Sequence, residues 1–358
     1  MEGPELLRIV DAIHREKEID PETLFEGIES ALLTAARKQY GTEGEINVAI
    51  DRKTGAIMAY EETPDGRIEI PLDLGRIAAQ TAKQVMIQRI REAERDVLFD
   101  EFVSDLHSIV NGTVQRYEGG TLIVNLGKSE AILPKSEQVR GEDYRVGDRI
   151  RAYVLDVKKA GQKIKIILSR SHPDFIGKLF ALEVPELREG FLAIRGLVRE
   201  AGYKTKMAVM SVDGKIDPIG ACVGVRGTRI KNVLDELRGE KVDVIRWSDS
   251  TEELISNALK PAVVNYLTLD SENMRAKVVV EDDQLSLAIG KRGQNVRLAA
   301  KLCKWDISIL TETELQSGAG EVEESADRIG RFDDDEELGG AGLTGAAQFE
   351  EPEDSKKG

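Results

Sequence analysis

Residues 217–247 read DPIGACVGVRGTRIKNVLDELRGEKVDVIRW, and residues 284–310 read QLSLAIGKRGQNVRLAAKLCKWDISIL. Each stretch contains a four-residue loop framed by two glycines, Gly224–Gly227 in the first and Gly290–Gly293 in the second. A single loop of this kind is a weak signal, because glycines at that spacing are common in turns. Its recurrence between matching apolar helical patterns indicates two copies of one supersecondary unit.

The same order of elements extends outward from both loops. In the first copy, a helix near 174–183 precedes strands at 191–198 and 206–212, a short helix from Asp217-Pro218, the loop, a helix at 228–237 and a strand at 242–247. The second copy has the same order, α-β-β-α-α-β, which resembles the type II KH domain. We call residues 173–249 the first repeat and 250–312 the second repeat.

The loops suit a phosphate–sugar backbone. Glycines let the chain turn sharply and allow close approach, and the start of the following helix favours an anion. In KH domains such a loop grips about four nucleotides beside an apolar groove. The alternative is a helix–turn–helix connection that binds nothing. We expect single-stranded RNA to contact Gly224, Val225, Arg226, Gly227, Arg229, Gly290, Lys291, Arg292, Gly293, Gln294 and Asn295, the arginines and Lys291 adding mobile positive charge.

Apolar residues beside the loops are assigned to core or groove, with core favoured for each alone: Val223, Ile230, Ile289, Val296 and Leu298. Aligning the repeats places Cys222 opposite Ala288 and Cys303 opposite Leu237. Both thiols therefore occupy apolar positions, and we expect them to be buried structural residues.

Residues 108–172 have a different pattern, with five short strands separated by glycine-containing turns. This predicts a five-stranded OB-type β-barrel, and the motifs V-x-G-x-V, V-N-L-G and Y-x-V-G-D resemble the S1 RNA-binding domain. The usual exposed Phe and His positions hold Ile123 and Pro134, so base stacking is weakened. Possible aromatic substitutes are Tyr117, Tyr144 and Tyr153.

The segment 108–172 carries 12 basic and 7 acidic residues. Its cations are candidates for phosphate contact, with ordinary solvated strand faces as the alternative. They are Arg116, Lys128, Arg149, Arg151, Lys158, Lys159, Lys163 and Lys165.

The N-terminal segment 1–107 is acidic. Its periodicity predicts two helices, then a hairpin over 46–60 with its turn at Arg52 to Gly55, and a long helix from Leu74 to about Phe99. The tail, 313–358, is rich in Gly, Ala, Asp and Glu. We expect it to be disordered, either solubilising the chain or competing with RNA.

Several protein classes are disfavoured by the composition. The 358 residues carry a net charge of −15, without a long apolar stretch or a signal peptide, so we expect a cytoplasmic protein that does not enter a membrane. The two cysteines and three histidines form no local metal or catalytic motif. We therefore expect no cofactor, no metal and no enzymatic activity.

The order of the parts resembles the NusA family of bacterial transcription termination/antitermination factors over residues 1–312. The specific stretches are LGRIAAQTAKQVMIQRIREAER, EVPELREG, AGYKTKMAV and the two loop-containing segments. The family implies a non-catalytic transcription elongation factor, a monomer that binds DNA-directed RNA polymerase through residues 1–107. It implies that the S1 and KH domains hold nascent RNA and that the factor modulates pausing, termination and antitermination with other Nus factors and a ribosomal protein.

The sequence departs from some members of the family, because it lacks their additional C-terminal acidic helical repeats. We therefore do not expect regulation that depends on those repeats. The alternative function is a ribosome-associated or RNA-processing protein built from S1 and KH domains.

Overall fold

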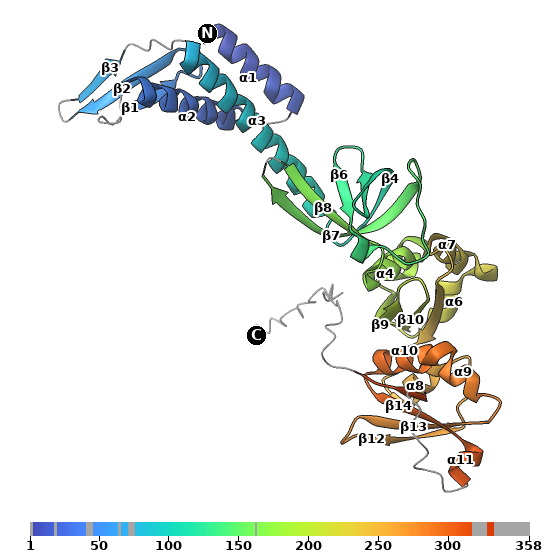
Figure 1. Ribbon diagram of the computed structural model, residues 1–358. Coiled ribbons are helices and arrows are strands. Elements are labelled where there is room, and N and C mark those ends of the chain that lie inside the picture. Colours follow the sequence, from blue (N-terminus) through green and yellow to red (C-terminus); the bar gives the residue numbers. More distant parts are fainter. Residues whose placement is uncertain are drawn as a thin grey trace, which may run out of the picture. The chain divides into compact units, whose positions relative to one another are not determined.

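A computed structural model describes residues 3–17, 20–40, 46–63, 66–70, 76–161, 163–316 and 328–332. The chain divides into two compact units. One contains residues 1–106 together with 156–166, and the other contains 107–155 together with 167–358. The segments of each unit can be followed by colour in Figure 1.

The first unit contains three helices and a three-stranded sheet among its described residues. They are α1 (Gly3–Lys17), α2 (Pro21–Tyr40), β1 (Ile46–Ile50), β2 (Ile57–Thr63), β3 (Gly66–Ile70) and α3 (Arg76–Ser104). The hairpin predicted over 46–60 is formed by β1 and β2, and β3 extends the antiparallel sheet. Apolar residues of α1 and α2, including Leu6, Val10, Phe25 and Ile28, form its core.

The tip of one barrel hairpin belongs to this first unit. There, Lys159 forms an ion pair with Asp96 of α3 at 2.8 Å. Arg95 donates a hydrogen bond to the carbonyl of Gly161 at 2.7 Å. Residues 156–166 therefore pack with α3, although the sequence places them in the segment 108–172.

The predicted five-stranded barrel is confirmed. Its strands are β4 (Ile109–Glu118), β5 (Thr121–Asn125), β6 (Glu130–Leu133), β7 (Arg149–Ala160) and β8 (Lys163–Ser169), closed in the order β4-β5-β6-β8-β7. Small and branched apolar residues fill the interior, among them Val114, Val124, Ala131 and Leu133. Closure leaves no free sheet edge.

Both repeats contain the predicted α-β-β-α-α-β order, and the first has one additional short helix, α5, after its first helix (Figure 1). The first contains α4 (Pro173–Glu183), α5 (Pro185–Arg188), β9 (Leu192–Glu200), β10 (Lys204–Ser211), α6 (Pro218–Val223), α7 (Thr228–Glu236) and β11 (Lys241–Arg246). The second contains α8 (Thr251–Leu259), β12 (Tyr266–Asp270), β13 (Arg275–Val280), α9 (Leu285–Ile289), α10 (Gln294–Cys303) and β14 (Asp306–Thr311). In each sheet the central strand pairs antiparallel with one neighbour and parallel with the other.

The two repeats share one hydrophobic core. Val198, Ala208 and Ile245 of the first sheet belong to the same buried cluster as Ile255 and Leu302 of the second repeat. A second cluster packs the other side of the first repeat, with Phe175, Phe180 and Cys222 buried there together with Tyr153 of the barrel. Residues 107–155 and 167–172 of the barrel segment therefore pack with the repeats in the second unit.

Two short parts of the segment 313–358, which is predicted to be a disordered tail, have secondary structure. Residues Glu312–Gln316 form helix α11, and Ile329–Gly330 form strand β15, which pairs antiparallel with β14. Gly330 lies so close to α10 that an added Cβ would come within 2.4 Å of the Val296 carbonyl oxygen. The rest of the predicted disordered tail lies outside the described residues.

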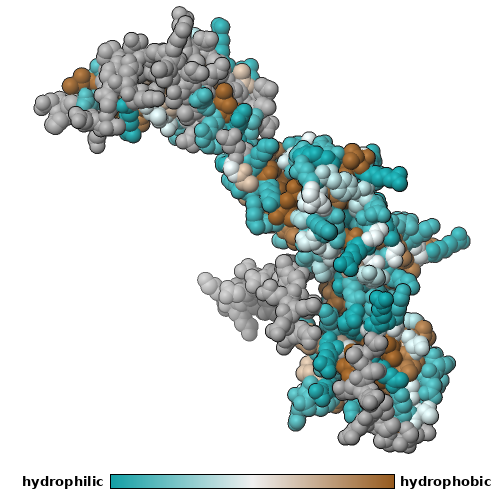
Figure 2. All heavy atoms as spheres, in the orientation of Figure 1, coloured by the Kyte–Doolittle hydropathy of each residue, from teal (hydrophilic) through white to brown (hydrophobic). Residues whose placement is uncertain are grey.

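On the face shown in Figure 2, hydrophilic residues cover most of the described surface and apolar residues occur in small separate groups. Among the described residues, no helix combines the length and the apolar character needed to cross a membrane.

Candidate nucleic-acid interface

The two glycine-framed loops have nearly the same backbone conformation. Gly224 has φ 75° and ψ 174°, and Gly290 has φ 73° and ψ 178°. At the third position, Arg226 and Arg292 both have φ 54°, in the left-handed region that side chains disfavour. The closing residues Gly227 and Gly293 are also left-handed, with φ 75° and 71°. The repetition found in the sequence is thus a repetition of conformation.

The first glycine of each loop is required for two reasons. Its positive φ favours glycine, and a Cβ would collide with the residue five positions later. At Gly224 the nearest atom would be Arg229 Cγ at 2.8 Å, and at Gly290 it would be Asn295 Cβ at 2.8 Å. At Gly227, by contrast, the nearest atom would be 3.9 Å away, so only the positive φ favours glycine at this position.

The centres of the loops are exposed. Arg226, Lys291 and Arg292 have exposed side chains that make no ion pair or hydrogen bond with any described residue. Val225 is 81% exposed, unusually high for a branched apolar residue. Helices α7 and α10 start at these loops without a side-chain N-cap hydrogen bond. Each loop therefore combines free positive charge with the amide end of a helix, which together favour a phosphate group.

The residues five positions after the first glycines stabilise the loops. The Arg229 guanidinium donates to Glu186 at 3.0 Å and to the Ala221 carbonyl at 2.7 Å. The buried Asn295 amide donates to the carbonyls of Leu259, Leu287 and Ala288 at 3.0–3.2 Å. The expectation that Arg229 provides mobile charge is therefore wrong, because its charge is already paired within the protein.

Polar contacts from the first repeat fix the second loop further. Lys204 donates to the side-chain oxygen of Asn295 at 3.1 Å, and Glu200 accepts hydrogen bonds from Gln294 and Arg297 at 3.0 and 2.6 Å. Gln294 is thus held at the joint between the repeats. The loop's support comes from residues almost a hundred positions earlier, which no local pattern could indicate.

Lys206 lies at the centre of the same joint. Its side chain is fully buried and donates to Asp243 at 3.0 Å and to the Ala258 carbonyl of α8 at 2.6 Å. Burial lowers the pKa of this ammonium group to about 8, even though Asp243 favours the charged form. Close to it, Gly196 leaves space for Leu302, whose Cδ1 would be 2.9 Å from an added Cβ.

A buried arginine connects the barrel to the first repeat. Arg170 is fully buried and donates to Glu142 of the barrel at 2.5 and 2.6 Å and to Glu236 of α7 at 2.9 Å. Beside it, Arg199 pairs with buried Glu240 at 2.9 Å and donates to the Arg170 carbonyl at 2.6 Å. These residues join the barrel to the first repeat, and sequence reasoning missed them because their partners lie 28 to 66 positions away.

The aromatic substitutes expected on the barrel are mostly unavailable. Tyr144 and Tyr153 are buried, and burial raises the pKa of both phenols. Ile123 is also buried, so it offers no stacking platform. Tyr117 is 49% exposed, so it is the only one of these three tyrosines with an exposed ring. Its hydroxyl donates a hydrogen bond to the Tyr144 carbonyl.

The candidate phosphate-binding cations of the barrel segment differ in their surroundings. Arg116 pairs with Glu118 and Glu130, Lys158 with Asp156, and Lys159 with Asp96. Exposed cations without a partner among the described residues are Arg149, Lys163 and Lys165. These three remain the better candidates for contact with phosphate.

The other residues predicted beside the loops fall mainly in the core. Cys222 and Cys303 are buried as expected, and burial raises the pKa of each thiol to about 12. Val296 and Leu298 are fully buried. Val223, Ile230 and Ile289 are half-buried, as expected for residues between core and groove.

The outer edges of the two repeat sheets differ. A groove of about 330 Å³ follows β11, lined by Ile219, Val244, Arg246 and Lys260 among others. At the equivalent edge of β14, strand β15 pairs with Ile307 and Ser308. A groove therefore follows the outer strand of the first repeat, with Asn257 and Lys260 of the second repeat in its lining, whereas part of the corresponding edge in the second repeat is covered by β15.

Protein-family models match nearly the whole described chain. The NusA N-terminal domain matches residues 5–64 and 64–96, the S1 RNA binding domain 105–171, the NusA-like first KH domain 170–247 and the NusA-like second KH domain 251–317. The chain is also 40% identical to the transcription termination/antitermination protein NusA of Halalkalibacterium halodurans, over 87% of this chain and 89% of that protein.

The chain belongs to the NusA family. The NusA protein of Bacillus subtilis is likewise 40% identical, over 87% of this chain and 91% of the relative. A solution structure of the N-terminal domain of NusA from B. subtilis is 36% identical and covers 25% of this chain and 97% of that domain, with a TM-score of 0.21. The S1 and KH domains of the NusA family indicate RNA binding.

Proposed function

We propose that this protein is a transcription elongation factor that binds RNA polymerase and nascent single-stranded RNA and thereby modulates pausing, termination and antitermination. The relatives are named as transcription termination/antitermination proteins. This name favours transcription over the alternative of a ribosome-associated or RNA-processing protein. The proposal places the protein in the cytoplasm, as a monomer that can join other Nus factors and a ribosomal protein.

The observation that best supports RNA binding is the pair of loops with matching conformation within one packed unit. Each presents free positive charge at the start of a helix, and the shared core of the repeats keeps the loops at a fixed separation. Once one loop holds an RNA strand, binding at the other becomes intramolecular, which raises the overall affinity. A single strand is favoured, because the KH mode of recognition needs unpaired bases beside the loop.

Within the loops we assign two roles. Backbone groups of Gly224, Gly227, Gly290 and Gly293, with Val225, Arg226, Lys291 and Arg292, face the RNA. Arg229, Gln294 and Asn295 act mainly by holding the loops in shape, since their side chains are already bonded within the protein.

We assign polymerase binding to residues 1–107 and RNA binding to the S1 domain 108–172 and the KH domains 173–249 and 250–312. The acidic tail 313–358 either solubilises the chain or competes with RNA for the basic surfaces. The first unit is acidic, and its long helix α3 has exposed positions such as Ile87 and Val97, which are compatible with a protein partner. This assignment of polymerase binding rests mainly on membership of the NusA family.

The decisive experiment measures the lifetime of a paused RNA polymerase with the full-length protein. We expect longer pauses with the wild type and a weaker effect with the double variant Lys291→Asp/Arg292→Asp. A companion experiment measures retention of the full chain on polymerase after nuclease digestion of all RNA. Retention supports direct polymerase binding. Unchanged pause lifetimes together with co-sedimentation with ribosomes would favour the alternative function.

A further inference from the structure

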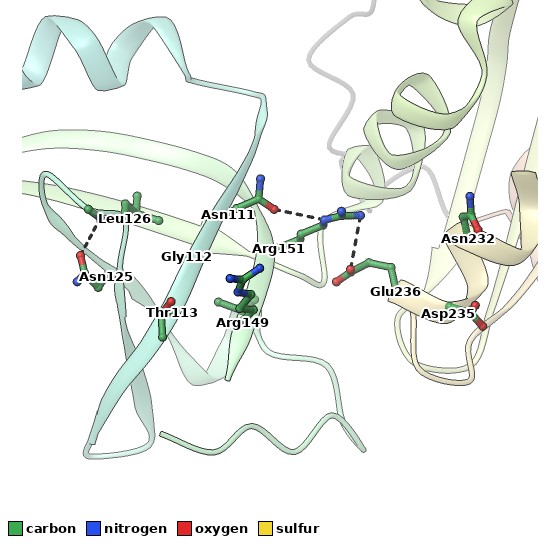
Figure 3. Close-up of a pocket in the computed structure, with 12 residues that line it drawn as sticks. Asn111, Gly112, Thr113, Asn125, Leu126, Arg149, Arg151, Asn232, Asp235 and Glu236 are labelled. Carbon is green, nitrogen blue, oxygen red and sulfur yellow. Dashed lines mark hydrogen bonds and ion pairs between the residues drawn. The ribbon is translucent and has the colours of Figure 1, made fainter. Parts of the chain in front are cut away.

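A polar cleft of about 730 Å³ lies between the barrel and helix α7 of the first repeat (Figure 3). The barrel side contributes residues of β4, β5 and β7, and α7 contributes Asn232, Asp235 and Glu236. Glycine is needed on the barrel side, because a Cβ at Gly112 would lie 2.4 Å from Val124 and 2.9 Å from the Asn125 carbonyl oxygen. The volume is in the range of sites that hold small organic molecules.

Most polar groups of the cleft are held by neighbours. Arg151 donates to Asn111 at 3.3 Å and lies 3.8 Å from a Glu236 oxygen. Asn125 accepts from the Gly127 amide at 2.7 Å, and Asn232 donates to Glu183 at 2.7 Å. These contacts fix the walls of the cleft before any ligand arrives.

Two charged groups on opposite walls have no partner among the described residues. Arg149 on β7 and Asp235 on α7 are both exposed, and neither forms an ion pair or hydrogen bond with a described residue. Figure 3 shows them on the barrel side and the helix side of the cleft. A ligand that satisfies both must carry an anionic group at one end and hydrogen-bond donors at the other.

We propose that this cleft binds one nucleotide of a single-stranded RNA, with Arg149 at a phosphate and Asp235 at the exocyclic amino group of the base. The inference rests on the proposed RNA-binding function and adds a third contact point beyond the two loops. A carboxylate accepts hydrogen bonds from an amino group such as cytosine N4, whereas uracil has no amino group to offer. The cleft therefore prefers an amino-bearing base to uracil.

A nucleotide fits the cleft better than a simple anion. Arg149 and Arg151 are balanced by Asp235 and Glu236 among the lining residues, so a free anion would meet repulsion as well as attraction. The side-chain amides of Asn111 and Asn232 add neutral donors and acceptors suited to a base edge. Glu236 also accepts from buried Arg170, so the network that joins the barrel to the first repeat fixes the helix wall of the cleft.

The test uses the full chain and three fluorescent RNAs: a hexamer, the hexamer with four cytidines added at each end, and the hexamer with four uridines added at each end. We expect the cytidine-flanked RNA to bind about tenfold more tightly than the uridine-flanked RNA. Asp235→Ala should abolish that preference. Arg149→Gln should weaken the binding of both flanked RNAs. It should also reduce the magnitude of the slope of log K against log[salt] by about 0.7, the value for one phosphate contact on a single strand.

Arg145→Gln is the matched control, since Arg145 is an exposed barrel arginine that does not line the cleft. It should leave all three affinities unchanged. The inference is overturned if Asp235→Ala keeps the cytidine preference, or if Arg149→Gln behaves like Arg145→Gln. In either case, hexamer binding that still depends on Lys291 and Arg292 leaves the proposed function standing. Failure of the wild type to bind any of the RNAs would instead overturn the proposed function itself.

Discussion

The loops of the two repeats share a backbone conformation but are supported differently. The first is stabilised within its own repeat, where half-exposed Arg229 bonds to Glu186 and Ala221. The second depends on buried Asn295, which connects it to its own helices and to Lys204 of the first repeat. Glycine positions determine the turn, whereas the surrounding packing determines how much stability the turn requires from other parts of the fold.

The largest expected effect tests this difference in support. Asn295→Ala removes a buried amide whose two N–H groups are shared among three backbone carbonyls and whose oxygen accepts from Lys204, and it should lower the free energy of unfolding by about 3 kcal/mol. Arg229→Ala removes a half-exposed ion pair and should cost about 1 kcal/mol or less. Urea denaturation of the two variants checks the contrast. Equal losses would show that the two loops are supported alike.

The second prediction tests the charge at the loop centres. Lys291→Asp/Arg292→Asp should weaken single-stranded RNA binding at least about tenfold, while Arg226→Asp has a smaller effect, because the first loop carries one such cation. Fluorescence anisotropy measures both. Arg275→Asp/Lys277→Asp is the control, since it reverses two exposed charges on β13 of the same repeat. Equal weakening by the control would show a general charge effect instead of a loop contact.

The third prediction concerns the joint on which the second loop depends. Because the folded-state pKa of Lys206 is about 8 and its ordinary value is 10.5, the unfolded chain binds more protons between these values. This group's contribution to the free energy of unfolding should therefore increase as the pH rises from about 8 to 10.5. Urea denaturation across this range should show a smaller increase for Lys206→Met. An identical pH dependence in the two proteins would contradict the assignment.

The fourth prediction tests the difference between the open and covered sheet edges. Gly330→Val cannot be accommodated beside α10, so it should displace β15 and expose the edge of β14. We expect RNA affinity to rise by about threefold, an effect of less than 1 kcal/mol. Arg331→Ala, in the same segment, should have little effect. A clear loss of affinity in the Gly330 variant would show that β15 belongs to the RNA-binding surface.

The smallest effect tests whether the loops are conformationally equal. Arg226→Gly and Arg292→Gly each relieve a left-handed backbone, and the greater freedom of glycine in the unfolded chain offsets part of the gain. Both should stabilise the protein by about 0.5 kcal/mol, with the same value in the two repeats. Thermal unfolding of the single variants checks this. Stabilisation of only one would show that the repeats differ in strain.

Much of the fold could be predicted because its signals are local. Hydrophobic periodicity and glycine-containing turns placed the barrel strands and the six elements of each repeat. The alignment of the repeats also identified both cysteines as core residues. The sequence could not show that the charge of Arg229 is paired or that Tyr144 and Tyr153 are buried. Residue type shows which interactions a side chain can make, but the residues that contact it come from distant parts of the chain.

Local patterns in the sequence were enough to predict the repeated unit and the cations at the loop centres, since glycine spacing and helical periodicity involve residues that are close together in the chain. Tertiary structure decided which polar side chains remain free. Arg170, Arg199 and Lys206 are buried because partners tens of residues away satisfy them, and Arg149 and Asp235 remain open across a cleft. Whether a charged side chain is free to bind a ligand therefore depends on the residues around it in the folded structure. A buried charge is tolerated only when other groups form hydrogen bonds with it.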